Sequence, residues 1–93
     1  MECEKVREIV RGYAAGFYAT GFAAERCIDK PLSVRDGSAQ RHLLYMCEEM
    51  LTWDDSRKEK MMRWLGFIQG VLAMVERTPI AVLKETNKPD ESA

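Results

Sequence analysis

The stretch MMRWLGFIQGVLAMV, residues 61–75, decides the fold. Its apolar residues recur at helical spacing and cover most of the circumference of a helix, and a helix that is apolar on most sides is a buried helix. Gly66 and Gly70 interrupt it, although glycine costs about 1 kcal/mol relative to alanine inside a helix. We therefore expect a buried helix whose glycines gain something that offsets their cost.

The two glycines belong to a stripe of small residues. On a helix that turns by about 100° per residue, the stripe falls within one narrow arc, and the segment GYAAGFYATGFAAER, residues 12–26, carries a second stripe with the same offsets. Without side chains, another backbone can approach closer than the usual 8–10 Å between helix axes and gain dispersion energy along the contact. We predict helix close packing or an oligomer interface at Gly12, Gly16, Ala19, Ala23, Gly66, Gly70 and Ala73.

Turn and capping signals divide the rest of the chain into helices. Pro31 and Gly37 punctuate the loop DKPLSVRDGS, where Asp36 or Ser38 can cap a following helix. Ser56 and Glu59 have the spacing of a capping box, and Thr78 before Pro79 is a further start signal. The predicted helices span residues 3–29, 39–51, 57–77 and 79–85.

These helices define the fold class. We find no sustained alternation of apolar and polar residues, so the sequence predicts an all-α protein, a small helical bundle of three long helices plus a short C-terminal helix. Residues 1–86 form a single domain, and residues 87–93, NKPDESA, form a flexible polar tail. Three helices can hardly surround one that is apolar nearly all round, so we expect a homo-oligomer.

Composition excludes several classes of protein. A net charge of -1 and a pI near 5.8 disfavour nucleic-acid binding. The charged N-terminal segment MECEKVREIV does not have the pattern of a signal peptide, and the longest apolar run is too short to span a bilayer. The three cysteines, Cys3, Cys27 and Cys47, are expected to be reduced thiols. We expect a cytoplasmic protein that does not enter membranes.

Catalytic and metal-binding signals are missing from the sequence. His42 is the single histidine, and the acidic stretch Glu48, Glu49, Asp54 and Asp55 does not have the spacing of a calcium loop. No nucleophile motif, phosphate-binding loop or dinucleotide fingerprint is present. We therefore expect no enzyme activity, no catalytic residue, no metal site and no cofactor.

A binding role has better support. The segment RKEKMMR, residues 57–63, carries several cations, Arg63 and Arg77 bracket the glycine stripe, and aromatic residues near them could stack on a base. This set fits a small nucleotide site or the charged rim of a protein interface, and the sequence does not separate the two. The candidate ligand- or partner-binding residues are Arg63, Arg77, Trp64, Phe67, Tyr13, Arg57 and Lys60.

The run RWLGFIQGVL, residues 63–72, preceded by HLLYMCEEM, residues 42–50, resembles small accessory proteins of tailed bacteriophages. The resemblance covers roughly half of the chain and brings no catalytic residue with it. It implies the cytoplasm of an infected bacterium and a protein that acts by binding, in the first place a counter-defence or host-takeover inhibitor that engages a bacterial defence protein.

Two alternatives remain open. The Arg-Trp-Leu start of the helix at residue 63 is similar to phage anti-CBASS sponges, which implies an oligomer that sequesters a cyclic-nucleotide immune signal. The turn before residue 57 followed by a basic helix start could instead imitate a helix-turn-helix, which would make the protein a DNA-binding regulator, although the acidic pI counts against this.

Overall fold

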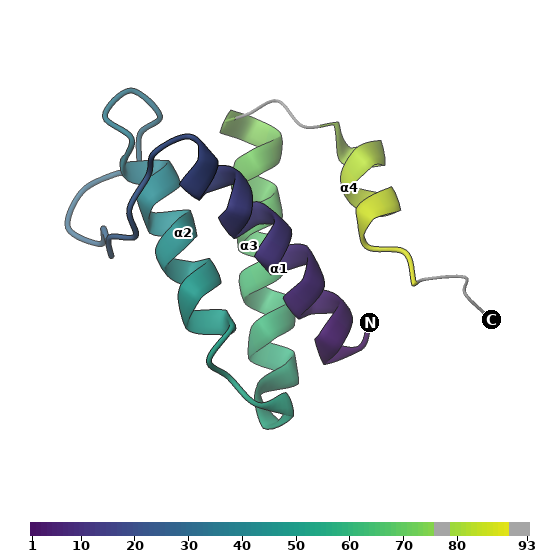
Figure 1. The fold of residues 1–93 in the computed structure, drawn as a ribbon. Helices are drawn as coiled ribbons and strands as arrows, with labels where there is room; N and C mark the ends of the chain where they lie inside the picture. Colours follow the sequence, from purple (N-terminus) through teal and green to yellow (C-terminus); the bar gives the residue numbers. More distant parts are fainter. Residues whose placement is uncertain (76–78, 90–93) are drawn as a thin grey trace.

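The computed structural model describes residues 1–75 and 79–89 and confirms the all-α class (Figure 1). About 67% of the described residues are helical, and none of them forms a strand. The helices are α1 (Cys3–Ala19), α2 (Ser38–Met50), α3 (Lys58–Val75) and α4 (Ile80–Thr86), and a single 3-10 turn, η1 (Asp55–Arg57), leads into α3. Arg77 and Thr78, which we expected to end one helix and cap the next, lie outside the described residues.

The first helix ends ten residues earlier than predicted, at Ala19 instead of residue 29. The backbone N–H of Phe22 donates to the carbonyl of Phe17, and that of Gly21 donates to Tyr18, with Gly21 at a φ of 87°. This is a Schellman motif, which needs a residue in the left-handed region after the C-cap. The rings of Phe17 and Phe22 meet edge to face at 6.5 Å and close the motif with an apolar contact.

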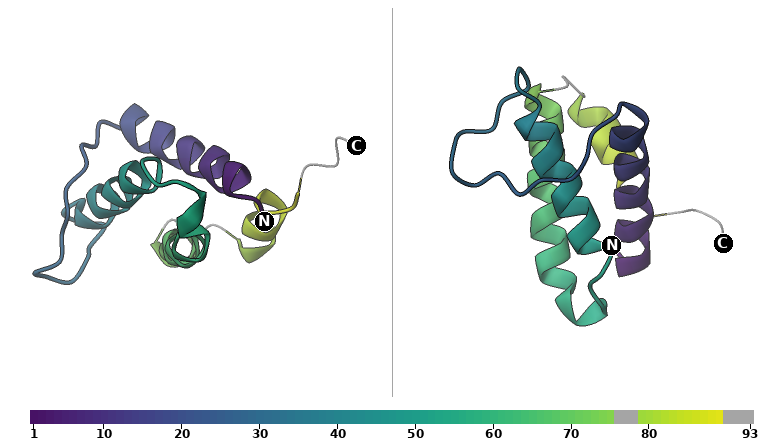
Figure 2. Two further views of the ribbon diagram at one scale, coloured as in Figure 1. Left: turned by 90° about the horizontal axis from the view of Figure 1, so that it is seen from below. Right: turned by 60° about the vertical axis from the view of Figure 1, so that its left-hand side comes forward.

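The three long helices enclose one apolar core, and α4 lies beside α1 and α3 on the side away from α2 (Figure 2). Every long helix contributes one buried face, spaced as the amphipathic pattern predicts. The residues with less than 2% exposure are Val6, Val10, Leu43, Leu44, Cys47, Met50, Met61 and Ile68.

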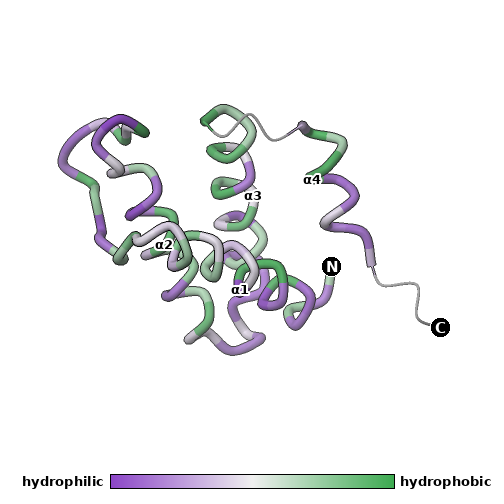
Figure 3. Tube along the Cα trace, turned by 45° about the horizontal axis from the view of Figure 1, so that its top comes forward, coloured by the Kyte–Doolittle hydropathy of each residue, from purple (hydrophilic) through white to green (hydrophobic). Residues whose placement is uncertain are grey.

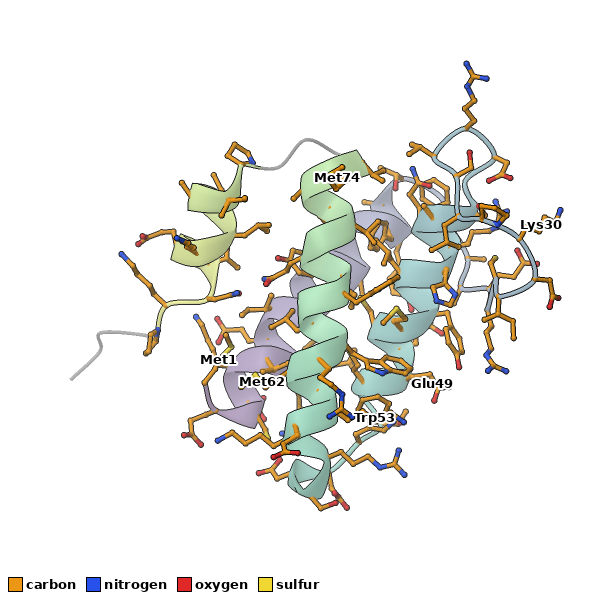
Figure 4. All side chains as sticks on the ribbon, turned by 180° about the vertical axis from the view of Figure 1, so that it is seen from behind. Met1, Lys30, Glu49, Trp53, Met62 and Met74 are labelled. Carbon is orange, nitrogen blue, oxygen red and sulfur yellow. The ribbon has the colours of Figure 1, made fainter. Side chains whose placement is uncertain are left out.

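In the single chain, α3 is buried on one face only, and its burial on the other sides by a second copy stays a prediction. Met61, Leu65, Ile68 and Leu72 face the core, whereas the opposite face of α3 is open. Figure 3 shows that the C-terminal part of α3 is strongly apolar, and Figure 4 shows α3 in front of the other helices with nothing drawn over it. Met74 on this outer face is 83% exposed.

The glycine stripes do not bring two helices of this chain together. A Cβ built at Gly12, Gly16, Gly66 or Gly70 meets nothing within 4 Å. Ala19 and Ala23 are exposed, and Ala73 is half-buried. Close packing within the chain is therefore not the reason for these glycines, and the oligomer interface remains a prediction.

The short α4 is attached to the body through few side chains. The amides of Gln69 and Asn87 form a reciprocal pair with both hydrogen bonds at 2.7 Å, and the amide of Gln69 also donates to the Tyr13 hydroxyl at 3.1 Å. Leu83 is the buried residue of α4. Asn87, the first residue of the predicted flexible tail, is thus held by α3, and residues 90–93 lie outside the described part of the chain.

Candidate ligand site

The turn between α2 and α3 builds a cluster of aromatic and basic side chains. Asp54 accepts a hydrogen bond from the backbone N–H of Ser56 at 2.9 Å, which starts η1 in place of the predicted Ser56–Glu59 capping box. This places Trp53, just before the turn, against Trp64 of α3, with ring centroids 4.7 Å apart in an edge-to-face arrangement. The turn therefore delivers an aromatic pair to the end of the α2–α3 interface.

Two cations lie over these indole rings. The Nζ atom of Lys60 is 5.0 Å from the Trp53 ring centroid and 5.4 Å from that of Trp64, and the Arg57 guanidinium carbon is 5.5 Å from the Trp53 ring. Neither Lys60 nor Arg57 forms an ion pair with a carboxylate among the described residues. Their charges are therefore held over the rings without a carboxylate in ion-pair contact, although hydrogen bonds from Ser56 and, to a smaller extent, the charge of Arg57 lower the pKa of Asp54.

The nearby Arg7 shows the contrasting arrangement. Its guanidinium pairs with Asp55 at 2.6 Å and also donates to the carbonyl of Trp53 at 3.0 Å. The resulting bridge from α1 to η1 fixes the backbone on which Trp53 sits. The hydrogen bond to Asp55, followed by its charge, holds the pKa of Arg7 above its ordinary value.

One face of α2 forms the opposite wall of the cluster. His42, Tyr45, Met46 and Glu49 follow one another at helical spacing and line a hollow of about 380 Å³ between α2 and α3. Figure 4 shows Glu49 and Trp53 on the α2 side of α3. The complete lining is Arg26, Ile28, His42, Tyr45, Met46, Glu49, Trp53, Arg57, Lys60 and Trp64, hereafter the aromatic–basic hollow.

His42 is held as a neutral hydrogen-bond donor. Its Nδ1 atom accepts the backbone N–H of Cys27 at 3.1 Å, so the ring proton of the neutral form sits on Nε2. The ring stacks obliquely on Tyr45 at 5.6 Å and meets Phe67 edge to face at 6.5 Å. Partial burial, and secondarily the charge of Arg26, lowers the pKa of His42 from its ordinary value.

The loop after α1 supplies the last cation of the hollow. Glu25 donates its backbone N–H to the Arg41 carbonyl at 3.1 Å, and its carboxylate pairs with the Arg41 guanidinium at 2.9 Å. With the Cys27–His42 hydrogen bond, these contacts fix residues 25–27 against α2 and bring Arg26 to the hollow. Arg26 also lacks a carboxylate partner among the described residues.

The structure brings together part of the predicted binding set. Arg57, Lys60 and Trp64 line the aromatic–basic hollow, and Phe67 contacts it through His42. Arg63 points into a separate shallow hollow at the start of α3, and Arg77 lies outside the described residues.

Sequence reasoning missed the contributions of α2 and of the loop after α1. These are His42, Tyr45 and Glu49, which share the three-, four- and seven-residue spacing of one helix face, together with Trp53 and Arg26. The spacing on α2 was a readable signal. The approach of Arg26 was not, because it depends on where α1 ends.

Tyr13 belongs to a different depression. A groove of about 490 Å³ between α1 and α4 is lined mostly by apolar residues and by the open backbone of Gly12 and Gly16. The Oε1 atom of Gln40, another residue of its lining, is buried without a hydrogen-bond partner. The described residues that line this groove include no charged side chain.

Most carboxylates of the acidic stretch between α2 and α3 form hydrogen bonds or ion pairs within the chain. Asp55 pairs with Arg7, Asp54 caps η1, and Glu48 accepts a hydrogen bond from the Tyr18 hydroxyl. Within residues 1–75 and 79–89, no three metal-ligating side chains of the His, Cys, Asp or Glu types gather at one point. Over the same residues, no helix is long and apolar enough to cross a bilayer.

Comparisons with known proteins add no relative. No protein-family model, curated protein or solved structure matches the chain.

Proposed function

We propose that this protein acts by binding and that its ligand is an anionic compound with a flat ring, of the nucleotide class. The observation that supports this is the position of Arg57 and Lys60 over the indoles of Trp53 and Trp64, at the wall of the hollow. Guanidinium and ammonium groups hold phosphate oxygens by charge-assisted hydrogen bonds. Aromatic rings beside them offer a face for a base, and such stacking contributes about 1–3 kcal/mol per base.

Preorganisation favours this role. Long cationic side chains lose rotamer freedom when they bind a ligand, at roughly 0.5–1.5 kcal/mol for each side chain immobilised. In this chain the indoles already restrict Arg57 and Lys60, and Arg26 is restricted at its backbone. Binding of a phosphate in the hollow would therefore cost less side-chain entropy than binding to freely rotating cations.

The composition of the hollow also supports binding without catalysis. Its described lining contains no serine, threonine or cysteine, and its other possible nucleophiles make no side-chain hydrogen bond to an activating base among the described residues; these are His42, Tyr45, Glu49 and Lys60. The Nδ1 atom of His42 accepts a hydrogen bond from the backbone N–H of Cys27, which holds the loop after α1 in place. We propose a sponge that holds its ligand unchanged.

The biological setting of the proposal comes from the resemblance to phage accessory proteins. A sponge of this kind would act in the cytoplasm of an infected bacterium and sequester a cyclic-nucleotide immune signal. Assembly into a homo-oligomer would increase the number of hollows per particle, and the uncovered outer face of α3 with Gly66 and Gly70 is the surface we propose for it.

A protein-binding inhibitor is the second candidate function. Phe67 and Met74 are 46% and 83% exposed on the outer face of α3, and exposed apolar side chains of this size are common at protein interfaces. In this case the target would be a bacterial defence protein and α3 would be the contact surface. For a DNA-binding regulator the support is weaker, because a net charge of -1 and a pI near 5.8 disfavour binding to a polyanion.

Titration calorimetry with a panel of mononucleotides and cyclic di- and trinucleotides tests the proposal. We expect at least one to bind the wild-type chain, and Arg57→Ala/Lys60→Ala to weaken its binding at least tenfold. The charge-matched control Arg35→Ala/Lys84→Ala removes two exposed cations away from the hollow and should change affinity less than threefold. Absence of binding across the panel, or equal loss in both double variants, would refute the nucleotide role.

A further inference from the structure

Glu49 contributes a negative charge to the described lining of the aromatic–basic hollow, whose other charged residues are cations. Glu49 lines the hollow together with Arg26, Arg57 and Lys60. Its carboxylate is exposed and makes no hydrogen bond or ion pair with any described residue, although cations line the same hollow. A site that bound phosphate alone would gain nothing from this negative charge.

Glu49 shares its face of α2 with the neutral His42. Seven residues, or two helical turns, separate them, and Tyr45 lies between them on the same face. Because Nδ1 of His42 is already an acceptor for the Cys27 N–H, the free nitrogen Nε2 is a donor. On the α2 wall, the Glu49 carboxylate can accept hydrogen bonds from two adjacent donors, Tyr45 provides an aromatic ring, and Nε2 of His42 can donate a hydrogen bond.

Among the common bases, guanine matches this wall best. A carboxylate takes two parallel hydrogen bonds when two donors lie side by side. Guanine presents adjacent N1–H and N2–H₂ donors, with O6 and N7 as acceptors on the neighbouring edge. Adenine and cytosine each present one amino group flanked by a ring-nitrogen acceptor, which would face the carboxylate with repulsion.

We infer that the aromatic–basic hollow takes a guanine nucleotide, with its phosphate at Arg57 and Lys60 and its Watson–Crick edge at Glu49. This inference rests on the proposed nucleotide-binding function. The cations come from η1 and α3 and the carboxylate comes from α2, so different elements of one hollow supply the groups for the phosphate and for the base. A volume of about 380 Å³ lies within the usual size of small-molecule sites.

The test compares GMP, IMP, AMP and CMP on the wild-type chain by titration calorimetry at one fixed salt concentration. We expect GMP to bind at least tenfold more tightly than AMP and CMP. IMP keeps N1–H and lacks the N2 amino group, so it should fall between GMP and AMP. This series needs no variant, and it therefore stays informative whatever a substitution does to folding.

Two variants locate the preference. Glu49→Gln should reduce the GMP-to-AMP ratio to threefold or less and leave AMP affinity within about threefold. Glu59→Gln, an equal change on an exposed position outside the hollow, should leave the ratio unchanged. If the four nucleotides bind with equal affinity and Arg57→Ala/Lys60→Ala abolishes that binding, the guanine assignment is overturned and the proposed function is supported. No binding of any nucleotide would overturn both.

Discussion

Replacing Gly66 by alanine should stabilise the single chain. The added Cβ meets open space, so the variant gains the difference in helix propensity, about 0.8–1 kcal/mol, without strain. Unfolding entropy of about 2.1 cal/mol/K per residue gives roughly 0.2 kcal/mol/K for this chain. The melting temperature should therefore rise by about 4–5 °C. If the outer face of α3 packs against a second copy, the same methyl group should lower the mass of the assembly.

Circular dichroism melts at low protein concentration and light scattering at high concentration separate these two effects. Gly21→Ala is the matched control, because its site is equally open but its φ of 87° disfavours any side chain by about 1–2 kcal/mol. We expect its melting temperature to fall by about 5–10 °C. A lower melting temperature for Gly66→Ala in a sample shown to be monomeric would contradict the open face of α3.

Three further outcomes follow from the core, the histidine and the thiols. Ile68→Ala should cost about 2–5 kcal/mol in denaturant unfolding, because Ile68 is fully buried and leaves a cavity. Because the pKa of His42 is lowered in the folded chain, the unfolded chain binds a proton at this histidine more readily. The contribution of His42 to the free energy of unfolding should therefore be fully present above about pH 6.5 and decrease as the pH falls below that value. His42→Gln should remove this pH dependence in melts at several pH values. Ellman's reagent should modify the half-buried Cys27 in the native chain and leave Cys47 unmodified until unfolding, because burial raises the pKa of Cys47 to about 12; equal rates would contradict this.

The helix order could be predicted from local signals. The predicted start signals, which were Gly37 before α2, the Ser56–Glu59 spacing before α3 and Thr78–Pro79 before α4, are each confined to a few residues, and the observed helices begin within one residue of the prediction. The cap before α3 is nevertheless Asp54 and not Ser56. The predicted end of α1 was wrong. The prediction continued the helix through Ala23 and Ala24 to the loop DKPLSVRDGS and did not use Gly21 as a stop signal.

The sequence prediction reached the candidate site only on its η1 and α3 side, although the face of α2 was also readable from helical spacing. Arg57, Lys60 and Trp64 are close in sequence, so helical spacing alone brings them near one another. Their meeting with Glu49 depends on how α2 packs against α3, and the position of Arg26 depends on hydrogen bonds that only the folded chain makes. The outer face of α3 is uncovered in the single chain, in line with the reasoning that three helices cannot surround a helix that is apolar nearly all round; its cover by a second copy stays a prediction.

The loose attachment of α4 has a thermodynamic consequence. Among the described residues, buried Leu83 and the amide pair of Gln69 and Asn87 attach this segment to the other helices. The free energy of separating it from α1 and α3 should therefore be a small fraction of the free energy of global unfolding. Segment 80–86 would thus behave as its own cooperative unit, releasing and reattaching many times during the life of the intact three-helix body. Each release would widen the groove beside Gly12 and Gly16 and expose fresh surface to any partner that competes for it.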